Sequence, residues 1–178
     1  MVLDHRSAVP LIAAADGHTG QLGILVTSIS EGLRTWGASD HTGSGRRIWT
    51  YGPEMVSDMT YLGRPSNHSM VLAMSGSNPR VELVEAVEGP STDRDWIVNR
   101  GYGLHDLGFF IDEVAGIVAP MEDDGFAMVQ SGRNTGADGT GAYAYFDTVS
   151  LMGFDIEAME VPRLRHPPHR VWPVDTRP

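Results

Sequence analysis

The chain contains an internal repeat, and this repeat limits the folds that it can adopt. The run Gln21–Val26 (QLGILV) is matched by Asp106–Ile111 (DLGFFI); in both, a polar residue comes first and a glycine third. A second pair follows in the same order, Val81–Ala86 (VELVEA) and Ile156–Val161 (IEAMEV), each with two glutamates three residues apart. Because repeated segments in a fixed order indicate repeated structural units, we expect two copies of one unit.

Each half of the chain is predicted to contain a strand, then a helix, then further strands. Apolar residues recur near helical spacing in 29–37 and 112–124, and a glycine marks the end of both stretches. The later strands are expected at 47–51, 59–62 and 69–74 in the first half, and at 126–130 and 142–147 in the second.

The segments around the two copies divide the rest of the chain. We expect an N-terminal arm at 1–19, a first module at 20–88, a connecting helix at 89–103, a second module at 104–162 and an extended tail at 163–178. Ser91 or Thr92 can cap the connecting helix, which ends before Gly101. The tail is rich in arginine and proline, so it is predicted to lie along the surface or on a partner chain.

Composition excludes several classes of function. The chain has no cysteine, and its 13 basic residues are all arginine, so thiolate chemistry, sulfur-ligated metals and lysine Schiff bases are excluded. A net charge of -10 argues against nucleic-acid binding, which needs a basic surface. No apolar run is long enough to cross a bilayer, so we expect a cytoplasmic protein without membrane contact.

The repeat also aligns polar residues. Side chains two residues apart on a strand share a face, so each polar starter, Gln21 or Asp106, lies on the same side as the glycine that follows it. If the copies pack around a pseudo-two-fold axis, these two residues converge with Glu82 and Glu157 on one cleft. For any one of them, a solvated strand end is the alternative. The partner glutamates, at 85 and 160, are on the opposite faces and are expected to be solvated.

Several segments resemble one protein family. The two copies, with Gly103–Phe109 (GLHDLGF), Ile156–Glu160 (IEAME) and the stretch from Gln130–Arg133 (QSGR) to Gly141–Asp147 (GAYAYFD), are similar to the vicinal oxygen chelate superfamily of glyoxalases, bleomycin-resistance proteins and dioxygenases. The resemblance is strongest to methylmalonyl-CoA-epimerase-like and glyoxalase-like members. It implies an α+β fold in which two tandem βαβββ modules form a curved mixed sheet around one cleft.

The resemblance implies a metal site with one ligand from the first and last strand of each module. These positions hold Gln21, Glu82, Asp106 and Glu157. The family typically has histidine at the first and third of them. The remaining oxygen donors would suit magnesium, manganese or calcium rather than zinc, and a site without metal is the equal alternative. The adjacent His105 is expected on the other face of its strand unless a bulge intervenes.

The resemblance further implies an enzyme of isomerase or lyase type that acts on a small carbonyl compound by proton transfer. Glu157 or Glu82 would be the base, Asp106 a second acid or base, and Gln21 a donor to the developing oxyanion. Candidate substrate-binding residues are Gln21, His68, Tyr143 and Tyr145. The alternative is a non-catalytic protein of the same fold that sequesters a small molecule. A homodimer is expected, because sheet edges and the tail offer a second copy places to bind.

Overall fold

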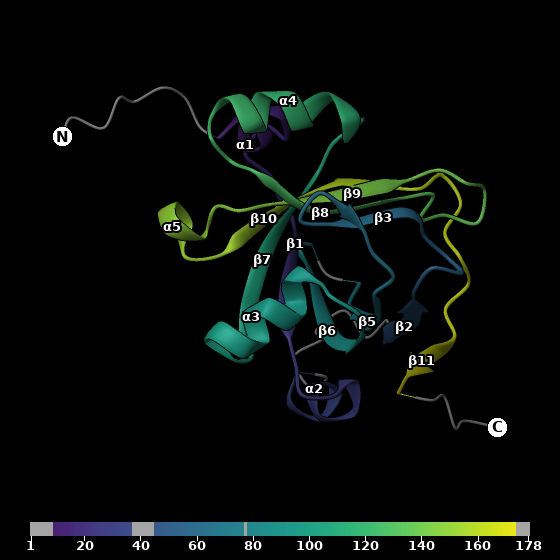
Figure 1. Ribbon diagram of the computed structural model, residues 1–178. Helices are drawn as coiled ribbons and strands as arrows, with labels where there is room; N and C mark the ends of the chain where they lie inside the picture. The colour runs from purple at the N-terminus through teal and green to yellow at the C-terminus, as the bar shows by residue number, and fades with distance from the viewer. Residues whose placement is uncertain (1–8, 37–44, 77, 174–178) are drawn as a thin grey trace.

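One mixed β-sheet organises the part of the chain that the structure describes, residues 9–36, 45–76 and 78–173 of the computed structural model (Figure 1). Its eleven strands run in the order β11-β2-β5-β6-β1-β7-β10-β9-β8-β3-β4. The strands are β1 (Thr19–Leu25), β2 (Arg46–Tyr51), β3 (Ser57–Tyr61), β4 (Arg64–Pro65), β5 (Ser69–Met74), β6 (Arg80–Glu88), β7 (Gly103–Phe110), β8 (Met128–Arg133), β9 (Ala142–Phe146), β10 (Asp155–Glu160) and β11 (Arg170–Trp172). The helices are α1 (Pro10–Ala14), α2 (Ile29–Trp36), α3 (Thr92–Arg100), α4 (Ala115–Asp123) and α5 (Val149–Met152).

The predicted duplication is visible in the sheet. The first copy consists of β1, α2, β2, β5 and β6, and the second of β7, α4, β8, β9 and β10. In each copy the first strand pairs in parallel with the last, and the two first strands, β1 and β7, pair antiparallel at the centre. Each copy has its own apolar core, beside α2 in the first and beneath α1 and α4 in the second. The α+β class with a curved sheet is therefore confirmed.

The second glutamate of each repeated pair binds a helix. Glu85 Oε2 accepts a hydrogen bond of 2.7 Å from the backbone N–H of Ile29, the first residue of α2. Glu160 Oε2 accepts one of 3.4 Å from the N–H of Val114, the residue before α4. Both carboxylates thus satisfy a backbone donor at a helix N-terminus. The expectation that these two glutamates are solvated was wrong, because their helices pack against that face of the sheet.

Two segments cross from one copy to the other. The strand expected at 59–62 forms β3, but it pairs with β8 of the second copy, where Thr60 Oγ1 lies 2.7 Å from Ser131 Oγ. The tail returns to the first copy, where β11 pairs with β2 and the Trp49 indole N–H donates to the His166 carbonyl at 3.0 Å. The tail therefore lies on its own chain, and Figure 1 shows it running down one side of the molecule.

The connecting helix begins and ends where the sequence predicts. Ser91 is the N-cap of α3, its hydroxyl accepting from the N–H of Arg94, and Gly101 ends the helix with a φ of 84°. Residues 10–14 of the N-terminal arm form α1, which packs on α4. None of the helices in the described ranges is long and apolar enough to cross a bilayer. Residues 1–8 of the arm, the glycine at 37 and residues 174–178 of the tail lie outside the described residues.

Candidate functional site

The strand register brings Glu82 and Asp106 to opposite sides of Gly23. In the sheet, Gly23 of β1 pairs with Glu82 of β6 on one side and with Asp106 of β7 on the other. Residues paired across neighbouring strands share a face, so both carboxyl groups project from the same side of the sheet. A Cβ atom on Gly23 would lie 2.0 Å from Asp106 Oδ1. The glycine of the first repeat therefore makes room for a carboxylate of the second.

The same arrangement recurs two residues away along the strands, around the glycine of the second repeat. Gly108 of β7 pairs with Gln21 of β1 and with Glu157 of β10. A Cβ atom on Gly108 would lie 2.3 Å from Met159 Cε and 3.4 Å from Glu157 Oε2. Residues two positions apart on a strand point to the same face of the sheet. The four predicted site residues therefore all project from one face, at the centre of the sheet.

A cleft of about 100 Å³ opens on this face. It contains Gln21, Glu82 and Glu157, and Tyr143 and Tyr145 of β9 also line it. The remaining wall is largely apolar, with one side formed by Val56, Met59, Met70, Leu72, Met74 and Phe110. The cleft thus combines a few buried polar groups with an apolar surround, as small-molecule sites commonly do.

Two of the predicted residues do not line the cleft. Asp106 is fully buried next to it. His68 is buried as well, and its Nε2 atom lies 3.2 Å from the hydroxyl of Tyr143. Burial lowers the pKa of His68 to about 4, so its ring is neutral at pH 7 and serves to hold Tyr143. His68 therefore contacts the cleft through Tyr143 only.

Glu82 and Glu157 are buried carboxyl groups with raised pKa values. Burial raises the pKa of Glu82 to about 8, with further increases from Asp106 and Asp93. Burial also raises the pKa of Glu157 well above its ordinary value, and the charges of Asp106 and Glu82 add to this. The Gln21 amide donates a 2.7 Å hydrogen bond to Glu82 Oε2, whereas Glu157 Oε2 is buried without a partner in the described structure. The pair therefore holds protons near neutral pH.

The two tyrosines of the cleft remain protonated. Burial raises the pKa of Tyr143 and of Tyr145, and nearby acidic groups raise both further. A hydrogen bond from Tyr145 opposes the increase in the pKa of Glu157, which is its partner across β9 and β10. The Tyr145 hydroxyl already donates to Glu157, whereas the Tyr143 hydroxyl can donate to a ligand in the cleft when His68 Nε2 carries the proton of their bond.

A β-bulge in β7 determines the position of His105. Gly23 pairs with Asp106, but the next residue of β1, Ile24, pairs with Leu104, so His105 is an extra residue in the ladder. A bulge interrupts alternation, and here it lets the ring and the next carboxylate meet: His105 Nδ1 lies 2.9 Å from Asp106 Oδ1. His105 thus holds the carboxylate that the sequence predicts for the site.

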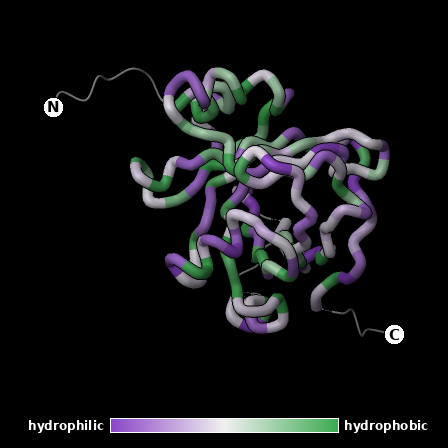
Figure 2. Tube along the Cα trace, viewed as in Figure 1, coloured by the Kyte–Doolittle hydropathy of each residue, from purple (hydrophilic) through white to green (hydrophobic). Residues whose placement is uncertain are grey.

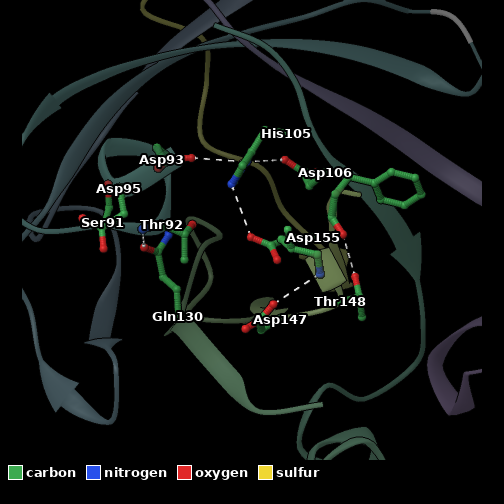
Figure 3. Close-up of polar contacts among 12 residues, drawn as sticks. Ser91, Thr92, Asp93, Asp95, His105, Asp106, Gln130, Asp147, Thr148 and Asp155 are labelled. Carbon is green, nitrogen blue, oxygen red and sulfur yellow. Dashed lines mark hydrogen bonds and ion pairs between the residues drawn. The ribbon is translucent and has the colours of Figure 1, made fainter. Parts of the chain in front are cut away.

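His105 lies among three aspartates, as Figure 3 shows. Asp93, from the first turn of α3, lies 3.6 Å from Nδ1, and Asp155 of β10 lies 3.7 Å from Nε2. Burial opposes a charge on the ring, but the hydrogen bond to Asp106 and the charges of all three aspartates outweigh it and raise the pKa of His105 to about 9. The cluster is therefore an imidazolium surrounded by carboxylates directly behind the cleft.

Two members of this cluster, Asp93 and Asp155, were not predicted from the sequence. Asp155 stands two residues before Glu157, so strand alternation alone places it on the site face. Asp93 offers no comparable signal, because an acidic residue in the first turn of a helix is ordinarily a surface residue that favours the helix dipole. Only the packing of α3 against β7 shows its role.

The four oxygen donors are not arranged as a metal site. Within the residues described, no three or more His, Asp or Glu side chains are grouped as a metal ion requires. Asp106 is paired with His105, and the Gln21 amide points its N–H, not its oxygen, at Glu82. A cation needs oxygen lone pairs that converge on one point. The predicted cation stays a prediction, and no step of the chemistry below depends on it.

Comparison with known proteins agrees with the fold. Residues 20–146 match the family model of the glyoxalase/bleomycin resistance protein/dioxygenase superfamily. A search of curated proteins gave no match.

Several solved structures share the fold. A variant of Streptomyces coelicolor methylmalonyl-CoA epimerase, in complex with 2-nitronate-propionyl-CoA, is 15% identical with a TM-score of 0.55, over 84% of this chain and 98% of that chain. The Mycobacterium tuberculosis methylmalonyl-CoA epimerase is 17% identical with a TM-score of 0.54, over 89% and 95%. A hypothetical protein of Bacillus halodurans is 20% identical with a TM-score of 0.50, over 83% and 96%. At these identities the likeness establishes the fold, and together with the family match it shows that this chain belongs to the glyoxalase/bleomycin resistance protein/dioxygenase superfamily.

Proposed function

We propose that this chain is an enzyme that moves a proton at a carbon atom next to a carbonyl group, and thereby epimerises or isomerises a small oxygenated substrate. One observation supports the proposal most strongly: Glu82 and Glu157, from equivalent positions of the two copies, are buried in one cleft with raised pKa values, and Glu82 adds to the increase in the pKa of Glu157. Two such carboxyl groups provide one acid and one base around pH 8, where Glu82 releases its proton before Glu157 does.

The surrounding charges assign the two roles. Arg165 and Arg80 oppose the increase in the pKa of Glu82, whereas the charges that shift the pKa of Glu157 most are all acidic. Glu82 therefore loses its proton first and is the base, and Glu157 keeps its proton and is the acid. Asp106, predicted as a second acid or base, acts instead through its charge, since it raises the pKa of both groups from outside the cleft.

The proposed reaction needs only these side chains. The Glu82 carboxylate takes the proton from the carbon, and the electron pair of the broken C–H bond moves toward the carbonyl oxygen. Gln21 Nε2 has two hydrogens, of which one binds Glu82, so the other can donate to the developing oxyanion. Glu157 then delivers its proton to the opposite face of the carbon. Exchange of protons with water restores both carboxyl groups.

Hydrogen exchange in D₂O tests this proposal. Methylmalonyl-CoA is a suitable probe, because epimerases of the same fold carry its name. We expect the wild-type protein to speed the exchange of the proton at the probe's branched carbon, followed by NMR. Glu82→Gln, which removes the base, should slow that exchange about 100-fold or more, the usual contribution of general acid–base catalysis. Glu88→Gln, on an exposed position of the same strand as Glu82, should leave the exchange unchanged. Equal rates for wild type and E82Q would refute the proposal.

The apolar wall of the cleft supports a second candidate, a protein that sequesters an apolar small molecule. Four of its residues come from the first half of the chain, Met70, Leu72 and Met74 on β5 and Met59 on β3. Methionine-rich surfaces adapt to ligands of different shape. Under this candidate, wild type and E157Q would bind an apolar ligand equally and neither would exchange its protons.

A further inference from the structure

Three arginines gather at one end of the cleft. A second cavity, of about 400 Å³, adjoins the cleft and shares Met74, Arg80 and Arg165 with it, and Arg47 lines its far side. Arg47 belongs to β2, Arg80 begins β6, and Arg165 lies in the tail between β10 and β11. Figure 2 shows this part of the tail as mostly hydrophilic. The tail, expected only to lie along the surface, thus supplies a charged residue to the cleft.

These guanidinium groups form no ion pair within the described part of the chain, although the charges of Arg80 and Arg165 act on the nearby Glu82. Arg163, two residues from Arg165, pairs with Asp138 at 3.5 Å, but none of the three arginines of the cavity forms such an ion pair. Arg80 rests on the ring of Phe110, with Cζ 4.9 Å from the ring centre. Burial and then the charge of Arg165 lower the pKa of Arg80, Glu82 opposes this decrease, and Arg47 adds to it. Three like charges held together in this way repel one another until an anion neutralises them.

Arginine is the residue type best suited to bind an oxyanion, and here three arginines gather in an otherwise acidic chain. The whole chain carries a formal net charge of -10, so a local group of three cations runs against its overall balance. The planar fork of arginine donates two parallel hydrogen bonds to a carboxylate or a phosphate, and arginine is preferred wherever such groups are bound. The cavity therefore has both the charge and the donors of an oxyanion site.

The position of the cavity connects it to the proposed chemistry. Arg80 and Glu82 are two residues apart on β6, so their side chains leave the same face of the sheet. A molecule whose anionic end lies between Arg80 and Arg165 would extend along this face into the cleft toward Glu82 and Glu157.

We propose that Arg47, Arg80 and Arg165 form a subsite for the carboxylate or phosphate group of an anionic substrate whose reacting carbon lies in the adjoining cleft. The assignment of an anionic substrate rests on the proposed function. Binding of an anion at the subsite does not require catalysis.

Isothermal titration calorimetry at low salt, with malonate and with inorganic phosphate, tests the subsite. We expect the wild-type protein to bind at least one of them, and Arg80→Gln and Arg165→Gln to weaken that binding about tenfold or more, because each removes charge-assisted hydrogen bonds. Arg163→Gln is the matched control, and we expect it to bind as the wild type does, since that arginine is exposed and already paired. Binding of malonate alone assigns a carboxylate, and binding of phosphate alone assigns a phosphate.

The proposal is overturned if the wild type binds neither anion, or if R80Q and R165Q bind as tightly as R163Q. Arg165 lies outside any helix or strand, so R165Q tests the subsite without disturbing the sheet. Glu157→Gln separates this proposal from the proposed function. If E157Q and wild type bind the anion equally and neither catalyses exchange, the enzyme proposal alone fails. If exchange depends on Glu82 but no anion binds, the subsite alone fails.

Discussion

Replacing Glu82 by glutamine should make the stability of the protein less dependent on pH. The pKa of Glu82 rises from an ordinary 4.5 to about 8 in the folded protein. Below pH 4.5 both folded and unfolded chains hold the proton, and the stability that depends on this carboxyl group is fully present. As the pH rises toward 8, the unfolded chain releases the proton and the folded chain keeps it. The free energy of unfolding then falls by about 1.4 kcal/mol per pH unit.

Summed from pH 4.5 to pH 8, this loss amounts to about 5 kcal/mol, a large part of the stability of an ordinary domain. In E82Q the amide oxygen still accepts the hydrogen bond of Gln21, but the side chain has no proton to release. The free energy of unfolding of E82Q should therefore increase relative to that of the wild type as the pH rises. Urea unfolding at pH 5, 6.5 and 8, followed by tryptophan fluorescence, measures the difference. Glu88→Gln, on the exposed end of β6, controls for the loss of a charge. A difference between E82Q and wild type that stays constant over this range would refute the reasoning.

Three further predictions concern the site. Gly23→Ala would place a methyl group 2.0 Å from Asp106 Oδ1, so we expect urea unfolding to show a loss of about 1–3 kcal/mol in the free energy of unfolding. The control Gly116→Ala, on the exposed side of α4, should cost no stability. Equal stabilities of the two variants would contradict the role of Gly23. His105→Leu should cost about 3–5 kcal/mol at pH 6, because it leaves buried carboxylates without their cation. Since the pKa of His105 rises from 6.5 to about 9, the stabilisation by its charged ring is full below pH 6.5 and is lost as the pH rises through 9. The difference in free energy of unfolding between the variant and the wild type should therefore narrow at pH 9.5. A difference that does not depend on pH would exclude a charged ring. Elemental analysis, with melting curves in magnesium, manganese, calcium and zinc, should show no stoichiometric ion and no shift, whereas a bound ion would show that Gln21 and Asp106 leave their present partners to ligate it.

The repeat predicts most of the fold and the location of the site, because both follow from strand register. Two copies with matched polar and glycine positions place Gln21, Glu82 and Glu157 on one face at the centre of the sheet. The paired glutamates are three residues apart, so one points to the cleft and the other to the opposite face. What lies on that opposite face is not encoded in alternation, and the helix-binding role of Glu85 was therefore missed.

Other features depend on contacts between segments distant in the sequence. The pairing of β3 with β8 of the second copy could not be predicted from the residues of β3, because the residue pattern of a strand does not determine which strand it pairs with. The bulge at His105 is set by the register between β1 and β7, and it alone turns this ring toward Asp106. The same holds for Arg165, which reaches the cleft only because the tail returns to the first copy.

The crossing of segments between the copies has a consequence for how the chain folds. Contacts such as that of Thr50 with His169 join residues 119 positions apart, so the edge of the first copy is completed by a segment that follows the second copy. Closing such long loops is entropically costly and slows folding. A fragment that ends after the first copy would lack β11 over β2, and one that begins with the second would lack β3 beside β8. The cleft therefore forms only after both copies and the segment that follows them have been synthesised. Separating the two repeats would yield two halves with unpaired sheet edges that are prone to aggregate.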